Sequence, residues 1–114
     1  MSQINIELLK LTSEILKIKT KVRYSSEFEL SGNRTEKILN ICSSVKANLY
    51  VSGPTALDYF DVNLANRYGI NVQWMDYFGY KKYSQLYPPF VHEVTILDLI
   101  FNEGPNAKNY MKSF

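Results

Sequence analysis

The chain has 114 residues, of which 46% are hydrophobic and 21% charged, and its formal net charge is +2 at pH 7. This composition excludes a disordered, collagen-like or coiled-coil protein, and the length predicts a single domain over residues 1–114. The small net charge excludes binding to nucleic acid by bulk electrostatics alone. We therefore expect no nucleic-acid partner.

The amino-terminal segment predicts an amphipathic helix, because apolar residues recur there at intervals of three or four: Ile4, Leu8, Leu11, Ile15 and Ile18. The start "MSQINIELLKL" lacks the basic segment, long apolar run and cleavage site of a signal peptide. The late run "VTILDLIF" is much shorter than the roughly 20 residues that span a bilayer. These features predict a cytoplasmic protein without membrane insertion.

A short strand, a loop and a second helix are predicted next. Val22 and Tyr24 alternate with basic residues and lead into "SSE", as in a strand that ends in small polar residues. From Asn33 the sequence offers an N-cap with Glu36 three residues on, followed by apolar positions at helical spacing. Cys42 is the only cysteine, so it cannot form an internal disulfide, and its position on this apolar face predicts a buried thiol.

The middle of the chain predicts a βαβ unit. "NLYVS" is a short apolar strand that ends at Gly53, the stretch from about Asp61 to Tyr68 is helical and ends at Gly69, and "INVQWM" alternates as a further strand. Strands separated by helices form parallel sheets through right-handed crossovers. We therefore predict an α/β fold of three layers, with a short parallel sheet built from βαβ units, flanking helices and an incomplete Rossmann-like sheet.

The carboxyl-terminal part begins with an irregular, tyrosine-rich segment, "YFGYKKYSQLYPPF", and continues into a helical pair. Thr95 can cap the first of these helices with Asp98 at its third position, and Gly104 separates it from the second. The aromatic side chains could cover a sugar ring or a partner, or they could pack in the core. The sequence leaves both readings open.

The loop "SGPT" at Ser52 follows a predicted strand, and ligands of open parallel sheets bind beyond the carboxyl ends of the strands. It is neither a Walker A loop nor a dinucleotide-binding fingerprint, because it lacks their lysine and their spaced glycines. Either this loop faces a ligand, or Gly53 and Pro54 only form the exit turn before Asp58 or Asp61 caps the next helix. Both alternatives remain open.

A second polar group lies in "SSEFELSGNRTEK", where Ser25, Ser26 and Arg34 could hold an anionic or hydroxyl-rich group near a helix N-terminus. Helix capping and a solvated charged face would also account for these residues. His92 is the sole histidine and is either a general base or a structural imidazole. No CxxC or HxxxH spacing occurs, so we expect no metal site.

Five pieces between Arg23 and Lys108 occur in order at ordinary spacing: "SSEFELSGNRTEKILNIC", "ANLYVSGPTALDYFD", "YGINVQW", "YSQLYPPF" and "VTILDLIFNEGPNAK". Their succession resembles the carboxyl-terminal half of the WbqC-like protein family. Phe60 and Thr95 depart modestly from the family pattern, which has leucine and serine at these places.

The resemblance implies a bacterial transferase that acts on sugar-linked substrates in surface polysaccharide or glycan biosynthesis. Its concrete form is transfer of an amino acid or acyl group to an amino sugar, with a sugar nucleotide or glycan precursor as partner. The resemblance identifies neither a catalytic residue nor a cofactor. Together with the patterns above, it yields these candidate substrate-binding residues: Ser25, Ser26, Glu27, Arg34, Ser52, Gly53, Asp61, Tyr83, Gln85 and His92.

Family members usually open with a segment resembling H-Q-P-N-Y-x-P-W-x-G-Y, and nothing like it occurs before Ile4. We therefore expect a truncated domain that is active only if the amino-terminal half is present. In the predicted sheet, Ser25 and Ser26 lie beside Ser52 and Gly53. The alternative is a noncatalytic binding or assembly module whose exposed sheet edge pairs with a partner chain or a second copy.

Overall fold

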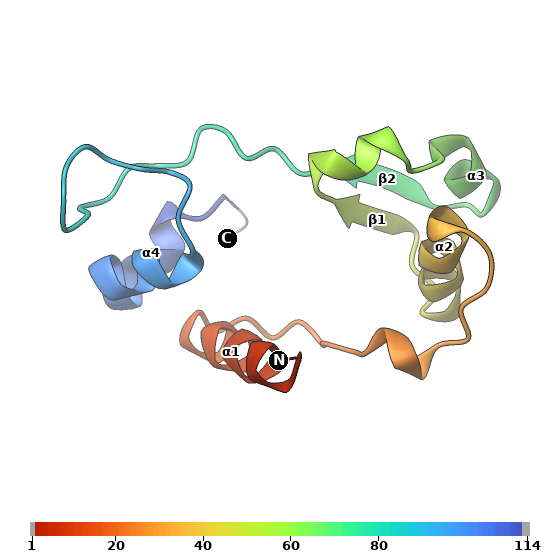
Figure 1. Cartoon of the computed structure of the whole chain (residues 1–114), viewed down its shortest axis with the longest axis horizontal. Coiled ribbons are helices and arrows are strands. Elements are labelled where there is room, and N and C mark those ends of the chain that lie inside the picture. The colour runs from red at the N-terminus through yellow and green to blue at the C-terminus, as the bar shows by residue number, and fades with distance from the viewer. Residues whose placement is uncertain (1, 113–114) are drawn as a thin grey trace. The chain divides into compact units, whose positions relative to one another are not determined.

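The computed structural model describes residues 2–112. The chain divides into two compact units. The central unit is Val22–Tyr77, and the split unit combines Met1–Lys21 with Phe78–Phe114. Figure 1 labels the helices and strands of both units.

The central unit contains a parallel βαβ unit. Strand β1 (Leu49–Ser52) pairs in parallel with β2 (Asn71–Trp74), and helix α3 (Val62–Arg67) lies in the connection between them (Figure 1). The side chain of Asp61 caps α3, and Gly69, with φ of 71°, turns the chain toward β2. The prediction of an α/β fold with a short parallel sheet and flanking helices is confirmed.

Helix α2 (Arg34–Ser44) begins where the sequence predicted. The side chain of Asn33 accepts a hydrogen bond from the Glu36 N–H at 3.0 Å, and the Glu36 carboxylate accepts one from the Asn33 N–H at 2.6 Å. This capping box satisfies backbone donors that have no partner within the helix. Gly32, with φ of 84°, precedes it, and a Cβ at this position would overlap the Glu36 side chain. The capping-box prediction is confirmed.

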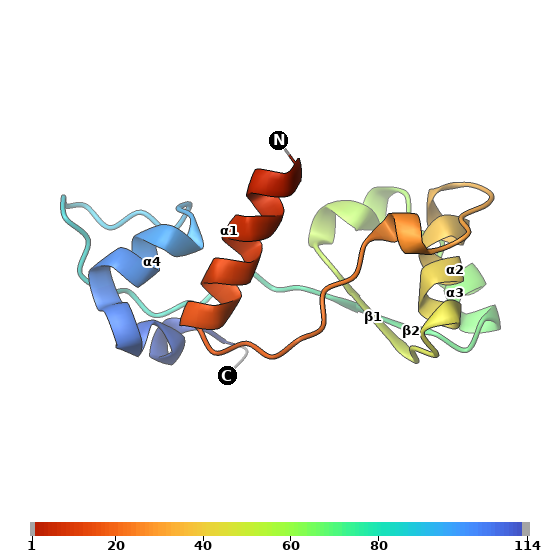
Figure 2. The same cartoon turned by 90° about the horizontal axis from the view of Figure 1, so that it is seen from below.

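The core of the central unit is an apolar cluster that α2 and α3 form against one face of the strand pair. Figure 2 shows the two helices together beside the strands. Phe60 stacks on Tyr50 with ring centroids 5.0 Å apart and meets Trp74 edge to face at 6.2 Å. Within the central unit, no helix covers the other face of the strand pair, where Leu49 and Val51 are exposed. The buried members of the cluster are Leu39, Cys42, Ala56, Phe60, Ala65 and Ile70.

Cys42 occupies the place predicted for it, since it is 7% exposed within this cluster. Burial raises the pKa of its thiol above the ordinary value, because the thiolate would lose hydration there. A thiol with a raised pKa is a weak nucleophile at neutral pH. Cys42 is therefore a core residue, as predicted.

The strand predicted over Val22–Tyr24 is not formed. The segment is extended but belongs to no sheet, and the described residues contain a two-stranded sheet, β1 with β2. Alternation of apolar and basic residues favours an extended backbone, but a strand also needs a hydrogen-bonded neighbour. Val22 and Tyr24 are 52% and 49% exposed, so the apolar side of this segment is not covered either. The expectation of a strand over Val22–Tyr24 is therefore wrong.

The split unit is mainly helical. It contains α1 (Ser2–Ile15), α4 (Ile96–Glu103) and the 3₁₀ helix η3 (Gly104–Tyr110), and its buried cluster is Leu16, Leu99, Ile100 and Ala107. Gly104, with φ of 51°, separates the last two helices as predicted. Within residues 2–112, no helix has the length and apolar character needed to cross a bilayer.

Candidate functional site

Hydroxyl groups gather at the carboxyl end of β1. Tyr50 and Ser52 are two residues apart on the strand, so their side chains share a face, and the Tyr50 hydroxyl donates to Ser52 Oγ at 3.1 Å. Gly53 follows at once, and a Cβ added to it would stand 3.0 Å from the hydroxyl oxygen of Tyr77. We call these four residues the β1-end site.

The β1-end site is uncharged and rich in hydrogen-bonding groups. Each hydroxyl can donate and accept, and a glycine lets a ligand approach the backbone closely. Tyr77 is 57% exposed, so much of its side chain is open to a ligand. Because ligands of parallel sheets bind beyond the carboxyl ends of the strands, this position and chemistry suit a neutral, hydroxyl-rich molecule.

Tyr77 was not among the candidate substrate-binding residues, although the sequence left open that the aromatic segment beginning at Tyr77 covers a sugar ring. The sequence carried a signal for it, because Tyr77 follows β2 by three residues, and parallel strands bring their carboxyl ends to one edge of the sheet. The Met75 N–H donates to the Ser52 carbonyl at 2.8 Å, which joins the ends of the two strands. Because the segment that begins at Tyr77 is rich in tyrosine, this positional signal did not single out Tyr77.

Asp61 has a structural place in the central unit. Its carboxylate accepts from the Leu64 N–H at 2.9 Å, and its own N–H donates to Thr35 Oγ1 at 3.2 Å. Thr35 is buried in the first turn of α2, so these bonds tie the start of α3 to that of α2. Next to them, the Arg34 guanidinium lies 4.9 Å from the centroid of the Tyr59 ring. The structure thus places Arg34 and Asp61 at the joined N-termini of α2 and α3.

Ser25, Ser26 and Glu27 form the 3₁₀ helix η1. Glu27 accepts from Arg23 Nε at 2.8 Å and from the Tyr24 N–H at 2.7 Å, so its carboxylate closes a local turn. Ser25 and Ser26 are both exposed.

The predicted neighbourhood of η1 with the β1-end site is not formed. Figure 1 shows η1 well apart from η2 (Pro54–Asp58), the turn that follows Gly53. The placement rested on a strand over Val22–Tyr24 that would have carried η1 to the end of the sheet. Because that segment pairs with no strand, nothing holds η1 beside Ser52.

Two further candidates, Tyr83 and Gln85, meet at Asp98 in the split unit. The Tyr83 hydroxyl donates to Asp98 Oδ2 at 2.6 Å, and Gln85 Nε2 donates to the same oxygen at 3.1 Å. The Gln85 amide also donates to the Val91 carbonyl at 2.7 Å and accepts from the Val91 N–H at 2.8 Å. We call these four residues the Asp98 network. It fixes the irregular segment before α4 to the first turn of that helix.

Burial, followed by the hydrogen bond to Asp98, raises the pKa of Tyr83 above the ordinary value of 10.0. The charges of Asp98 and Glu103 act in the same direction, and the bond from Gln85 acts in the opposite one. Tyr83 is therefore a neutral phenol at pH 7 and serves the network as a donor.

His92 is exposed, and its ring packs edge to face on Phe90 with centroids 4.6 Å apart. Phe90 packs in the same manner on Tyr83 at 5.1 Å, so His92 borders the Asp98 network through an aromatic contact. Among residues 2–112, no group of three or more His, Cys, Asp or Glu side chains is placed to hold a metal ion. The role of His92 as a general base stays a prediction.

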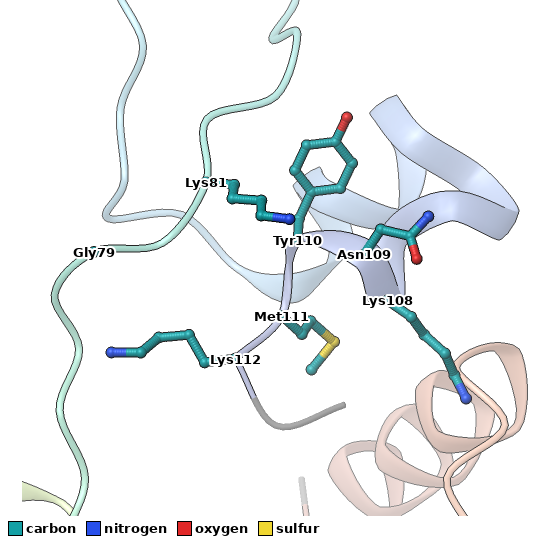
Figure 3. A pocket seen from close by; sticks show the side chains of 7 residues that line it. All are labelled: Gly79, Lys81, Lys108, Asn109, Tyr110, Met111 and Lys112. Atoms are coloured by element: carbon teal, nitrogen blue, oxygen red, sulfur yellow. The ribbon is translucent and has the colours of Figure 1, made fainter.

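A groove of about 630 Å³ lies in the split unit (Figure 3). Its residues come from two segments far apart in the sequence, and none of them was predicted as a site residue. The sequence signal was the pairing of lysine with tyrosine in both "YKKY" and "NYMK". We call this the lysine groove, and it is lined by Gly79, Lys81, Lys108, Asn109, Tyr110, Met111 and Lys112.

Comparison with known proteins finds a match to the model of the WbqC-like protein family over residues 1–110. A curated relative from Mycobacterium tuberculosis, with the printed name "Uncharacterized protein Rv1507c", is 39% identical over 112 residues. The aligned region covers 98% of this chain and 48% of the relative, so the chain spans about half the length of that relative. No solved structure matches the chain.

Proposed function

Because this chain belongs to the WbqC-like protein family, we propose that it is part of a cytoplasmic transferase for sugar-linked substrates in bacterial surface polysaccharide or glycan biosynthesis. The reaction that we propose for the complete protein is transfer of an amino acid or acyl group to an amino sugar. The observation that carries this proposal is the β1-end site.

The β1-end site supports sugar recognition through its neutral hydrogen-bonding groups. A sugar presents hydroxyls that both donate and accept, and Ser52, Tyr50 and Tyr77 offer groups of the same kind. The contact from Tyr50 to Ser52 at 3.1 Å orients the serine hydroxyl before a ligand arrives. The apolar ring of Tyr77 can cover the C–H face of a sugar. We propose that Ser52 and Gly53 contact the acceptor sugar directly.

The experiment is a titration of the ¹⁵N-labelled chain with glucosamine, an amino sugar that carries no phosphate. Ser52→Ala should weaken binding about tenfold, which corresponds to the loss of one well-placed hydrogen bond. Ser43→Ala is the matched control, because it removes an exposed hydroxyl from the last turn of α2. Ser26→Ala, in the same series, decides whether η1 contributes to binding. Equal losses for Ser52→Ala and Ser43→Ala would refute the site.

A second candidate function is a noncatalytic assembly module, and the uncovered face of the strand pair favours it. Parallel sheets are normally covered on both faces, yet Leu49 and Val51 are 46% and 47% exposed on the face away from α2 and α3. Within residues 2–112 no third strand joins the pair, so its outer edges could accept a strand of a second copy or partner chain.

Light scattering after size-exclusion chromatography tests this second candidate. The assembly function predicts a mass above that of one chain, and Val51→Lys should return it to the monomer because a charge on that face opposes burial. Ser43→Lys, outside the strands, controls for the change of charge, because it also adds one positive charge at an exposed position. A measured mass equal to that of one chain at all concentrations would exclude self-assembly through this sheet.

A further inference from the structure

We propose that the lysine groove of the split unit binds a ligand that carries a diphosphate, the class to which nucleoside-diphosphate sugars belong. The anion-binding part of this inference stands on the groove alone. The assignment of the anion to a sugar nucleotide rests on the proposed function.

The first argument is the charge of the lining. Lys81, Lys108 and Lys112 lie among the seven lining residues, and none of the seven is an aspartate or glutamate. The whole chain, by contrast, has 13 basic and 11 acidic residues, so the groove concentrates positive charge locally. Cations that line a concave surface focus the electrostatic potential and raise the local concentration of anions. Lysine also binds phosphate as a point charge.

The second argument is the size and spread of the groove. Its volume of about 630 Å³ lies within the range of roughly 300–1,000 Å³ that is usual for small-molecule sites. Figure 3 shows that the three lysine ammonium groups point in different directions and do not converge. A compact anion such as a single phosphate cannot contact all three. An anion with two phosphate groups offers two contact points along the groove where a single phosphate offers one.

The third argument is that contacts within the unit hold the two walls of the groove together. Lys112 Nζ donates to the Phe78 carbonyl at 2.6 Å and lies 5.2 Å from the centroid of the Tyr80 ring. These contacts connect the carboxyl-terminal wall to the segment that carries Gly79 and Lys81. Walls that are already joined need less ordering when a ligand binds.

Tyr110 stabilises the same wall. Its ring packs on Tyr83 at 5.8 Å between centroids. Desolvation, followed by the charge of Glu103 and a hydrogen bond to it, raises the pKa of Tyr110. The phenol is thus neutral at pH 7, and the carboxylate that it contacts, that of Glu103, is not among the residues that line the groove. Its position next to Tyr83 also connects the groove to the Asp98 network.

The test titrates the full ¹⁵N-labelled chain with inorganic pyrophosphate at about 50 mM salt, because screening of exposed charges is weaker there. The backbone amides of Gly79, Lys81 and Asn109 should show saturable shifts. The double variant Lys81→Gln/Lys108→Gln should weaken binding at least tenfold. Its matched control is Lys37→Gln/Lys46→Gln, which also removes two positive charges, but from the central unit. This control should change the affinity less than twofold.

Three results would overturn the anion site. These are equal losses in the two double variants, shifts confined to the central unit, or no saturation at millimolar pyrophosphate. Thermal melts of each variant check folding. If the double variant has a lower melting temperature than the unchanged chain, Lys81→Gln alone takes its place, because Lys81 is exposed. The loss of this one lysine should still weaken binding severalfold.

Further titrations separate this inference from the proposed function. UDP and UDP-glucose should compete with pyrophosphate, and uridine should not. Pyrophosphate binding without competition by either nucleotide would refute the assignment to nucleoside-diphosphate ligands. If pyrophosphate binds through Lys81 while Ser52→Ala leaves glucosamine binding unchanged, the anion site stands and the sugar site at β1 fails.

Discussion

The central unit is a continuous segment built on a strand pair and two helices, whereas the split unit joins residues from both ends of the chain. The central unit buries Leu39 and Ile70 almost completely. In the split unit, the irregular segment before α4 is connected to the helix by the side chains of Tyr83 and Gln85. The difference teaches that a segment without strand or helix partners depends on side chains to satisfy its backbone.

Leu39→Ala should have the largest effect on this comparison. Leu39 is 0% exposed, and truncation of a fully buried leucine typically lowers the free energy of unfolding by about 3 kcal/mol. Urea unfolding followed by the fluorescence of Trp74, the sole tryptophan, measures the loss in the central unit. Leu57→Ala is the control, because Leu57 is 55% exposed and should cost less than about 0.5 kcal/mol. Similar losses at both positions would contradict the core described for this unit.

Asp98→Asn should have the next largest effect, and it tests the polar basis of the split unit. The variant replaces the charged acceptor of two hydrogen bonds, and we expect a loss of about 1.5 kcal/mol because the site is only half-buried. Hydrogen exchange of the Val91 amide, which donates to Gln85, should become faster. Asp58→Asn, in an exposed turn of the central unit, is the control. Unchanged exchange at Val91 would show that the network does not hold this segment.

The two N-caps allow a direct comparison between the units. The Asn33 side chain caps α2 with a hydrogen bond, whereas the Thr95 side chain makes none at the start of α4. Asn33→Ala should therefore cost about 1 kcal/mol and Thr95→Ala only a few tenths. Thermal unfolding of both variants measures the difference. A larger cost at Thr95 would mean that this hydroxyl acts by another contact.

The smallest effect is expected at alkaline pH in the split unit. The folded pKa of Tyr83 is raised above 10.0, so folding favours the protonated phenol. Below the unfolded pKa this contribution to stability is fully present, and it is lost as the pH rises through the folded pKa, because the unfolded chain releases its proton first. Stability measured from pH 9 upward should fall less steeply in Tyr83→Phe than in the unchanged chain. Identical slopes would contradict the raised pKa.

Local features of the fold could be predicted from short stretches of sequence. The capping box at Asn33 and Glu36 needs side chains three residues apart, and the break at Gly104 needs one residue that tolerates a positive φ. The burial of Cys42 follows from its place on a helical apolar stripe. Such features depend on neighbours in the chain, so the amino-acid order determines them.

The candidate site could be predicted only in part. Ser52 and Gly53 lie at the end of β1 as expected, because a parallel strand pair has a defined carboxyl edge. Ser25 and Ser26 do not join them, since the segment before them lacks a strand partner. Tyr83 and Gln85 were recognised as candidates, but their common partner Asp98 emerged only from the structure.

The sequence by itself determined the α-helices, the capping box of α2, the parallel strand pair and the family. Tertiary structure alone decided whether Val22–Tyr24 became a strand, how Tyr77 reached Gly53, and that Lys81 lines a groove with Lys108 and Lys112. The physical reason is the range of the interactions. Helix caps and apolar periodicity act over a few residues, whereas strand pairing and grooves require distant segments to meet, which depends on the packing of the whole unit.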